Sequence, residues 1–318
     1  GAIMSHANVL NFAAWVRERF TVTSADVLTN VNPMYFDNSV FDFYGAMLNG
    51  AAIAPVTRET VTDAGAMLAQ IEEAGCTVWF SVPSLLIYLT TVKALEAHRL
   101  PSIRLFVFGG EGYPKPELRK LFDMFGSRSG LVNVYGPTEC TCICSARDVT
   151  AADLEEAGAL VTLGPVAANF SMLVLGEDDT MVEPGGIGEL ALMGPQVGLG
   201  YIGDPERTAQ SFTGNPVNRN WHEPMYRTGD LVRLGEDGRR LAFVGRKDNQ
   251  IKHMGYRIEL EEIEAALQQL EGVSQAAVVH VAGRREMKML VAYVATAVAY
   301  SDDQMREWLP KLVGVERS

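Results

Sequence analysis

Residues 133–139, Asn-Val-Tyr-Gly-Pro-Thr-Glu, place an aromatic ring, a turn, a hydroxyl group and a carboxylate within one short run. The segment that leads into it, residues 131–134, has the composition of a short apolar strand. Gly136-Pro137 breaks regular structure, so it turns the chain at the carboxyl end of that strand. Ligands of open α/β sheets bind at this edge. The run therefore predicts a ligand site, although an ordinary strand and turn would show the same residues.

Three side chains of this run are suited to a nucleotide. Tyr135 can stack on a base, and the Thr138 hydroxyl can donate a hydrogen bond to a phosphate oxygen. Glu139 can hold a magnesium ion, which takes few protein carboxylates and completes its coordination with substrate phosphates. Tyr135 and Gly136 are thus candidates for nucleotide binding, Thr138 and Glu139 for catalysis, and Glu139 also for metal binding.

Three later segments follow in a fixed order. They are residues 188–201, from Gly-Glu-Leu to Gly-Tyr; residues 226–231, Tyr-Arg-Thr-Gly-Asp-Leu; and residues 245–260, which begin Gly-Arg-Lys-Asp. Together with residues 133–139 they resemble the adenylation domains of nonribosomal peptide synthetases, members of the adenylate-forming superfamily that includes acyl-CoA synthetases and luciferases. The resemblance extends over nearly the whole chain. Agreement of several motifs in order is far more specific than one glycine-rich match.

The resemblance implies a reaction in which the carboxylate of an α-amino acid attacks the α-phosphorus of ATP, with magnesium, to give aminoacyl-AMP and pyrophosphate. Such chemistry depends on positioning and on charge neutralisation. The aminoacyl group then passes to the phosphopantetheine thiol of a peptidyl carrier protein. The residues that match the nucleotide-binding positions are Gly109, Gly110, Glu111, Tyr135, Gly136, Asp230, Phe243 and Arg246, and Lys252 matches a catalytic residue of the second half-reaction.

Some of these assignments also have a reason in the residue types. A carboxylate has acceptor sites for two ribose hydroxyls, which suits Asp230. Gly109 and Gly110 have no Cβ atoms, so their backbone can lie flat against an adenine edge. Arg246 would donate to the ribose and phosphate side. An aspartate before Leu-Val is otherwise usually a turn or cap residue, so the role of Asp230 rests on the resemblance.

Substrate choice is expected from residues 35–41, Tyr-Phe-Asp-Asn-Ser-Val-Phe, which resemble the family motif whose aspartate pairs with the α-ammonium group of the substrate. Asp37 holds that position, and the alternative is an ordinary helix-capping aspartate. The other residues that match the substrate pocket are Phe36, Asn38, Phe41, Ser81, Val107, Gly109, Val134, Cys142 and Ile143. This lining has no second carboxylate and no lysine, so it predicts a small or medium-sized neutral α-amino acid.

Two parts of the family pattern have no match in the chain. The Ser/Thr/Gly-rich phosphate loop would precede Gly1, and the Gly-Lys motif with the adenylating lysine would follow Ser318. We therefore expect a portion of a longer enzyme, truncated at both ends and inactive by itself. The alternatives are a shortened chain that binds nucleotide without catalysis, and an acyl- or aryl-CoA synthetase. Asp37 opposes the last alternative, because a buried carboxylate would repel an acid that has no amino group.

Composition limits the function classes. The length of 318 residues suggests two domains, and the formal net charge of -12 argues against a nucleic-acid partner, which would need clustered Lys and Arg. The basic stretch of Arg284, Arg285 and Lys288 is interpreted as a solvated hairpin tip. No apolar run reaches the roughly 20 residues that span a bilayer, and the N-terminus lacks a secretory signal. We therefore expect a cytoplasmic protein with no membrane partner.

The cysteines stand at positions 76, 140, 142 and 144. Zinc sites usually combine Cys-x-x-Cys with a second pair of ligands, a pattern that this spacing does not match. Alternation over residues 140–144 predicts instead one face of a strand that follows the nucleotide turn. Disulfide bonds are not expected without a secretory signal.

Apolar periodicity indicates the elements that must position these residues. Helices and strands alternate between residues 60 and 150, which predicts an α/β fold with a parallel sheet layer. The expected helices are 59–74, 84–97 and one opened by Pro114 and Pro116, and the expected strands are 77–82, 104–108 and 131–134. Short strands at 171–175 and 188–193, between Gly, Pro and Asp turns, predict a small β-subdomain over residues 160–245.

The pattern changes again after residue 247. An amphipathic helix is expected at 259–270, strands at 276–281 and 289–296, and a closing helix at 302–313 with Ser301 as its N-cap. We therefore assign residues 1–247 to a large adenylation core and residues 248–318 to part of a small α+β C-terminal domain. The resemblance implies that this domain is mobile, with its hinge at Asp248.

Overall fold

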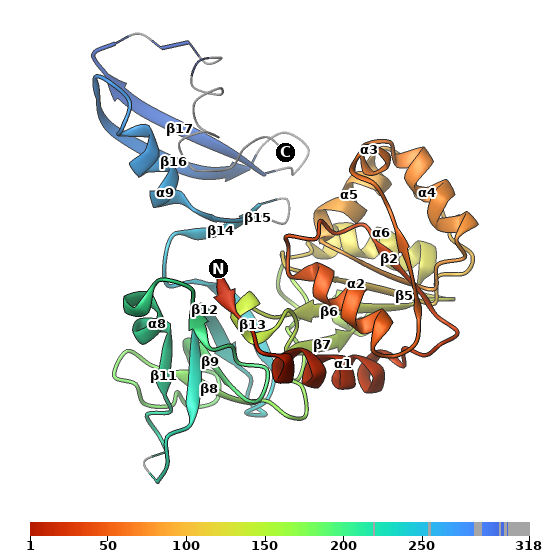
Figure 1. Ribbon diagram of the computed structural model, residues 1–318, viewed down its shortest axis with the longest axis horizontal. Helices are drawn as coiled ribbons and strands as arrows, with labels where there is room; N and C mark the ends of the chain where they lie inside the picture. The colour runs from red at the N-terminus through yellow and green to blue at the C-terminus, as the bar shows by residue number, and fades with distance from the viewer. Residues whose placement is uncertain (219, 254–255, 283–287, 299, 302–303, 305–318) are drawn as a thin grey trace. The chain divides into compact units, whose positions relative to one another are not determined.

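The computed structural model describes residues 1–318 except 219, 254–255, 283–287, 299, 302–303 and 305–318. The chain divides into two compact units, Gly1–Lys247 and Asp248–Ser318. The first unit combines a six-stranded sheet between helices with a smaller β-rich part (Figure 1). Within the described residues, no helix combines the length and the apolar character that crossing a membrane requires.

The six-stranded sheet has the strand order β3-β2-β4-β5-β6-β7. Its strands are β2 (Val27–Asn30), β3 (Ala52–Pro55), β4 (Val78–Ser81), β5 (Leu105–Gly109), β6 (Gly130–Tyr135) and β7 (Ser145–Asp148). The strands from β3 to β6 are parallel, whereas β7 runs antiparallel to β6. The predicted α/β fold is confirmed, but the sheet is mixed rather than purely parallel, because the short connection after Tyr135 sends the chain straight back along β6.

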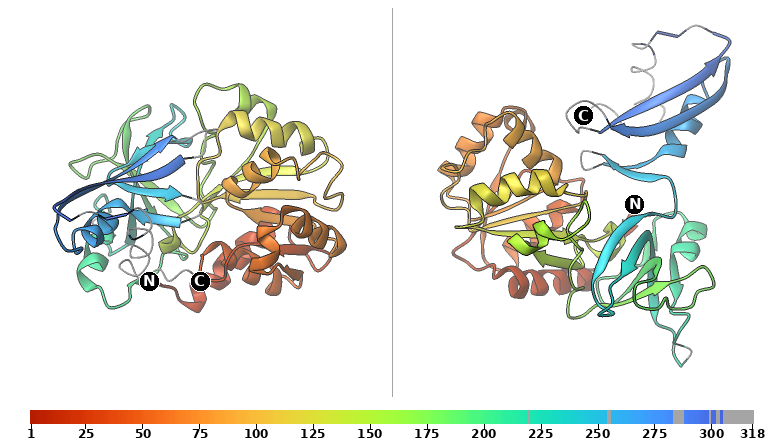
Figure 2. Two further views of the ribbon diagram at one scale, coloured as in Figure 1. Left: turned by 90° about the horizontal axis from the view of Figure 1, so that it is seen from above. Right: turned by 180° about the vertical axis from the view of Figure 1, so that it is seen from behind.

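Helices cover both faces of this sheet (Figures 1 and 2). One face carries α1 (His6–Phe20) and α2 (Asn38–Met47), and the other carries α4 (Ala64–Glu73), α5 (Pro83–Thr91) and α6 (Lys115–Phe125). Successive strand residues point to opposite faces. Phe80 and Val107 accordingly pack with α1 and α2, whereas Trp79 and Phe106 pack with the other three helices. The core is therefore two apolar layers on either side of the central strands.

Two predicted helices have different bounds in the structure. The single helix predicted at 59–74 is wrong, because the chain forms α3 (Arg58–Thr62) and α4, separated at Asp63. The Asp63 carboxylate accepts hydrogen bonds from the backbone amides of Gly65 and Ala66, at 2.9 and 3.0 Å, and so starts a new helix. The helix predicted at 84–97 ends early, since α5 stops at Thr91 and Lys93 adopts a positive φ of 58°.

The β-rich part of the first unit has the strand order β11-β12-β9-β8, with β13 also paired to β12. These antiparallel strands are β8 (Ser171–Leu175), β9 (Ile187–Met193), β11 (Phe212–Gly214), β12 (Pro224–Leu234) and β13 (Leu241–Arg246). The remaining elements are the pair β1 (Ala2–Ile3) and β10 (Gly200–Tyr201), the 3-10 helix η1 (Thr138–Cys140), α7 (Ala151–Glu155) and α8 (Pro205–Ser211).

The second unit contains two antiparallel strand pairs and one helix among its described residues. Strand β14 (Gln250–His253) pairs with β15 (Tyr256–Glu259), and β16 (Val273–Ala282) pairs with β17 (Lys288–Thr296). Helix α9 (Leu260–Leu267) is shorter than predicted, and its Glu264 carboxylate accepts a hydrogen bond from the Val278 amide at 2.8 Å. The predicted tip at Arg284 and Arg285 and, apart from Gln304, the predicted helix at 302–313 lie outside the described residues.

Candidate active site

The carboxyl ends of β4, β5 and β6 meet at one edge of the larger sheet. Ser81, Gly109 and Tyr135 are the last residues of these strands, and the register pairs Ser81 with Phe108 and Gly109 with Val134. A Cβ atom at Gly109 would lie 2.4 Å from the Val134 carbonyl oxygen, so this position requires glycine. At this edge, the neighbouring strands β4, β5 and β6 therefore carry both residues predicted to bind the nucleotide, such as Tyr135, and residues predicted to bind the substrate, such as Ser81 and Val134.

The turn after β6 folds back tightly. A Cβ atom at Gly136 would lie 2.3 Å from the Cys142 carbonyl oxygen, which places residues 136 and 142 against one another. Thr141 and Cys142 adopt positive φ angles of 59° and 73°, and β7 begins only at Ser145. The prediction that Cys140, Cys142 and Cys144 alternate along a strand is therefore wrong, because this left-handed turn interrupts extended backbone.

The four cysteines are all buried free thiols. Burial raises the pKa of the Cys140 thiol well above its usual range. The pKa of Cys142 is raised by burial and further by the nearby carboxylates of Asp37 and Asp42. Both thiols are therefore protonated at neutral pH and act as small apolar side chains beside the turn.

Asp230 links Tyr135, at the end of β6, to Arg246 at the end of β13. It lies on β12 with 3% of its surface exposed, and its Oδ2 accepts a hydrogen bond from the Tyr135 hydroxyl at 2.5 Å. Its Oδ1 accepts one from the Arg246 guanidinium at 2.7 Å, across the β12–β13 pair. Burial, and then the Asp230 carboxylate, raise the pKa of the Tyr135 hydroxyl well above its usual range, so it stays a donor. The structure thus brings Tyr135, Asp230 and Arg246 together.

Glu139 lies in η1 and is only 2% exposed. Its Oε1 accepts a hydrogen bond from the Tyr201 hydroxyl at 2.5 Å, and Tyr201 in turn lies 3.4 Å from the Tyr226 hydroxyl. A buried carboxylate oriented by a tyrosine hydroxyl fits the magnesium site expected here, since magnesium takes one or two carboxylates and otherwise phosphate oxygens and water. No group of three possible metal ligands is found within the described part of the chain.

Asp37 and Thr138 are in direct contact. The Thr138 hydroxyl donates a hydrogen bond to Asp37 Oδ2 at 2.6 Å, although the two residues are far apart in sequence. Asp37 stands at the N-cap position of α2 but makes no side-chain capping bond. Its carboxylate is therefore turned away from the helix end and toward the turn that follows β6.

Five of the residues predicted to line the substrate pocket lie in the apolar interior of the first unit. Phe41, Val107, Val134, Cys142 and Ile143 belong to one buried apolar cluster. The partly buried Asn38 begins α2, the buried Ser81 ends β4, and the partly buried Phe36 precedes Asp37. A Cβ atom at Gly110 would lie 3.9 Å from Asn38 Nδ2, so the glycine pair adjoins α2. Glu111 accepts a hydrogen bond from the Ser84 amide at 3.3 Å, at the start of α5.

Three further predicted residues lie on other elements. Phe243 is 38% exposed on β13, where it is paired in register with Val232. Lys252 lies on β14 and Asp248 is the first residue of the second unit, where its Oδ1 accepts a hydrogen bond from the Gln250 amide at 3.2 Å. Their roles stay predictions.

Two polar residues of the site were not predicted. Tyr201 lies in the motif at 188–201 but was given no role, although a tyrosine at a strand end is suited to bind a carboxylate. Asp42 is fully buried on α2, where burial raises the pKa of its carboxyl well above the usual range. An acid one position after Phe41 and three after Ser39, on the buried side of an apolar helix, is the signal that could have identified it.

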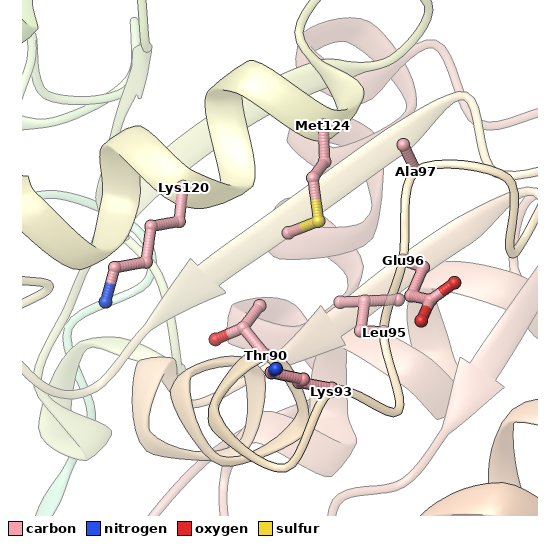
Figure 3. A pocket seen from close by; sticks show the side chains of 7 residues that line it. All are labelled: Thr90, Lys93, Leu95, Glu96, Ala97, Lys120 and Met124. Atoms are coloured by element: carbon pink, nitrogen blue, oxygen red, sulfur yellow. The ribbon is translucent and has the colours of Figure 1, made fainter.

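A separate pocket of about 380 Å³ lies between α5 and α6 (Figure 3). Its lining residues are Thr90, Lys93, Leu95, Glu96, Ala97, Lys120 and Met124. None of these is a predicted site residue, and the Lys120 ammonium is paired with Glu117 at 2.6 Å. The pocket therefore does not mark the nucleotide site.

Comparisons with known proteins agree with the geometry. The L-proline–[L-prolyl-carrier protein] ligase of Streptomyces coelicolor is 38% identical over 278 residues, which make up 87% of this chain and 50% of that protein. The chain thus spans about half the length of that relative. The Vibrio cholerae adenylation domain AlmE, solved in complex with glycyl-adenosine-5'-phosphate, has a TM-score of 0.84 and 26% identity, over 97% of this chain and 57% of that chain.

A third comparison is with PA1221, described as a nonribosomal peptide synthetase protein containing adenylation and PCP domains. Its TM-score is 0.75 with 31% identity, over 88% of this chain and 54% of that chain. Residues 1–202 match the family described as AMP-binding enzyme. With this match, and with the adenylation domains among its structural neighbours, the chain belongs to the family of AMP-binding enzymes.

Proposed function

We propose that the chain forms the amino-acid- and nucleotide-binding part of an ATP-dependent ligase. The enzyme activates an α-amino acid as aminoacyl-AMP and transfers it to the phosphopantetheine thiol of a carrier protein. The observation that carries this proposal is the 2.6 Å hydrogen bond from Thr138 to Asp37. It joins the expected ammonium-binding carboxylate to the expected phosphate-binding turn, so a bound amino acid would present its carboxylate beside the nucleotide.

Two similar proteins support this activity. The Streptomyces coelicolor relative is a ligase that acts on a carrier protein, and the Vibrio cholerae adenylation domain binds glycyl-adenosine-5'-phosphate. In our chain the pocket residues Phe41, Val107 and Val134 are apolar and buried, which suits a neutral side chain. We therefore propose a small or medium-sized neutral α-amino acid as substrate. Because the reaction consumes ATP, we propose that it takes place in the cytoplasm.

Asp230 is proposed to bind the ribose. One site on each of its two oxygens is taken, by Tyr135 on Oδ2 and by Arg246 on Oδ1. Each carboxylate oxygen has two acceptor sites, so each can still accept a hydrogen bond from one ribose hydroxyl. The Arg246 guanidinium also donates to the Thr228 carbonyl at 3.0 Å, which fixes its position beside the carboxylate. These hydrogen bonds support a ribose site whose side chains are positioned before nucleotide binds.

Glu139 is proposed to hold the magnesium ion. When bound, magnesium neutralises the phosphate charge that would otherwise repel the attacking carboxylate. Tyr201 orients the Glu139 carboxylate by donating to Oε1, and the neighbouring Thr138 hydroxyl donates to Asp37 Oδ2. Both side chains are held by hydrogen bonds to other side chains of the first unit, so they need little reorganisation when substrates bind.

The ribose assignment gives a prediction. In the full-length protein, Asp230→Asn should weaken AMP binding by about 10- to 100-fold, because the amide has one acceptor oxygen where the carboxylate has two and carries no charge. Isothermal titration calorimetry with AMP measures this. Asp153→Asn is a matched control, since Asp153 is also buried and bonded to an arginine, Arg147, but takes no part in the proposed site.

The control should bind AMP within about threefold of the wild type, within the scatter of single-residue effects at remote sites. Equal AMP affinity of the Asp230→Asn variant and the wild type would reject the ribose role. Absence of AMP binding by the folded wild type would reject the nucleotide site as a whole.

A further inference from the structure

Asp42 is a buried acid with an unusual set of partners. It lies on α2 with none of its surface exposed. Its Oδ2 accepts hydrogen bonds from the side-chain amides of Asn32, at 2.9 Å, and Asn30, at 3.3 Å. Within the described residues its Oδ1 makes no hydrogen bond. A buried polar atom without a partner is costly, so a hydrophobic residue of similar size would be expected here unless the carboxyl has a function.

Asn32 joins Asp42 to a second element. Its Nδ2 donates both to Asp42 Oδ2 and to the backbone carbonyl of Phe80 on β4, each at 2.9 Å. Asn32 is itself buried. The side-chain amide therefore bridges α2 and the carboxyl end of β4 at one point.

The two bridged residues adjoin the proposed amino-acid pocket. Asp42 directly follows Phe41, and Phe80 directly precedes Ser81; both neighbours are among the residues proposed to line the pocket. The Phe41 and Phe80 rings also meet edge to face, with their centroids 4.9 Å apart. The α2 side of the proposed pocket is thus joined to the β4 side by the two hydrogen bonds of the Asn32 amide and by the contact between the Phe41 and Phe80 rings.

We propose that Asp42 and Asn32 act as a specificity-determining clamp, which holds α2 at a fixed distance from β4 and so sets the width of the amino-acid pocket. This inference rests on the proposed function. Asp42 is a positioning residue, because it acts through the backbone positions of Phe41 and Ser81. Discrimination between side chains that differ by one methylene requires walls that do not move apart, and hydrogen bonds behind the lining residues provide that rigidity.

The charge state of Asp42 agrees with this role. Burial raises the pKa of its carboxyl well above 3.8, and the amides of Asn32 and Asn30 lower it only in part. Among the described residues, the Cys142 thiol interacts electrostatically with both Asp42 and Asp37, and neither Cys142 nor Asp37 supplies a positive charge. A protonated carboxyl still accepts both amide hydrogen bonds on Oδ2. The isosteric, neutral variant Asp42→Asn should therefore preserve the clamp.

The test compares Asp42→Leu, Asn32→Ala and Asp42→Asn in the full-length protein. The measured quantity is the ratio of kcat/KM in amino-acid-dependent pyrophosphate exchange for the preferred amino acid over its homologue with one more methylene. Asp42→Leu and Asn32→Ala should lower this ratio at least about tenfold and raise the KM for the amino acid, with little change in the KM for ATP. Asp42→Asn should keep the wild-type ratio.

A second measurement is independent of activity. Between pH 3.8 and the raised pKa of Asp42, the folded protein holds a proton that the unfolded chain releases, so this group makes the wild type less stable as the pH rises. Asp42→Asn has no such proton. Its Tm should exceed that of the wild type by at least about 2 °C at pH 8, with the difference closing toward pH 4.

Asp26→Asn is the matched control, because Asp26 is buried and bonded to Arg104 and Thr77 just before β2, at the other end of that strand from Asn30. This variant should lose stability and keep the selectivity ratio.

An unchanged selectivity ratio in both Asp42→Leu and Asn32→Ala, with normal pyrophosphate exchange, would overturn the clamp and leave the proposed function standing. If Asp42→Leu does not fold, the selectivity ratio of Asn32→Ala by itself tests the clamp. Absence of exchange with every amino acid in the wild type would overturn the proposed function instead.

Discussion

Replacing Asp37 by alanine in the full-length protein is expected to lower kcat/KM for amino-acid-dependent pyrophosphate exchange severely while AMP binding stays near the wild-type level. Asp37 is half-buried in the free protein. Once the bound substrate covers it, loss of the charged partner of the ammonium group costs about 2 to 5 kcal/mol, or roughly 30- to 4,000-fold in kcat/KM. Exchange of labelled pyrophosphate into ATP measures the first effect and calorimetry with AMP the second.

Two further variants separate this role from a helix cap. Asp37→Asn keeps an acceptor for the Thr138 hydroxyl but removes the charge, so it should lose nearly as much activity as the alanine variant. Asp63→Ala removes a side chain that does cap a helix, α4, and should lower stability without affecting exchange. Equal exchange by Asp37→Ala and the wild type would show that Asp37 is no more than a residue at the start of α2.

Asp248→Pro is expected to affect the two half-reactions unequally. Asp248 is the first residue of the second unit, and we propose that this unit turns about it between adenylation and thioester formation. Proline fixes φ near -65° and removes the amide donor, so it restricts the backbone torsions that would absorb the movement. Thioester formation should fall by about a hundredfold, because Lys252 and its strand would no longer reach their position.

Measuring each half-reaction separately tests this. Pyrophosphate exchange reports adenylation, and transfer of labelled amino acid to the carrier protein reports the second step. Asp248→Ala is the matched control, since it removes the carboxylate that accepts from Gln250 but leaves the backbone free, and it should support both steps. Equal, small effects of Asp248→Pro on both half-reactions would reject the hinge.

The sequence predicted best what depends on local pattern. Strand β8 has the predicted bounds, 171–175. A short apolar run between turn residues strongly favours a strand over other secondary structure. The residues of the turn after β6 were assigned to one site because their order resembled a family. The contact between Thr138 and Asp37 required the fold, since it joins residues from two strand–helix connections that are distant in sequence.

What the sequence missed depends on tertiary contacts or on single backbone angles. Nothing in the alternation of Cys140, Cys142 and Cys144 indicates that Thr141 and Cys142 adopt positive φ angles. Asp63 divides a continuous helical pattern because its side chain offers the backbone an alternative partner. Asp42 gains its role from Asn32 and from a carbonyl on β4, neither of which is adjacent in sequence.

We propose that an amino acid and ATP bind side by side around Asp37 and Thr138 and react. Pyrophosphate exchange by the full-length protein, against a panel of α-amino acids and of aryl and acyl acids that have no amino group, tests it most directly. We predict ATP- and magnesium-dependent exchange with one or a few small or medium-sized neutral α-amino acids, and none with the other acids. Preferred turnover of an aryl or acyl acid would contradict the claim, because the carboxylate of Asp37 would then have no ammonium partner.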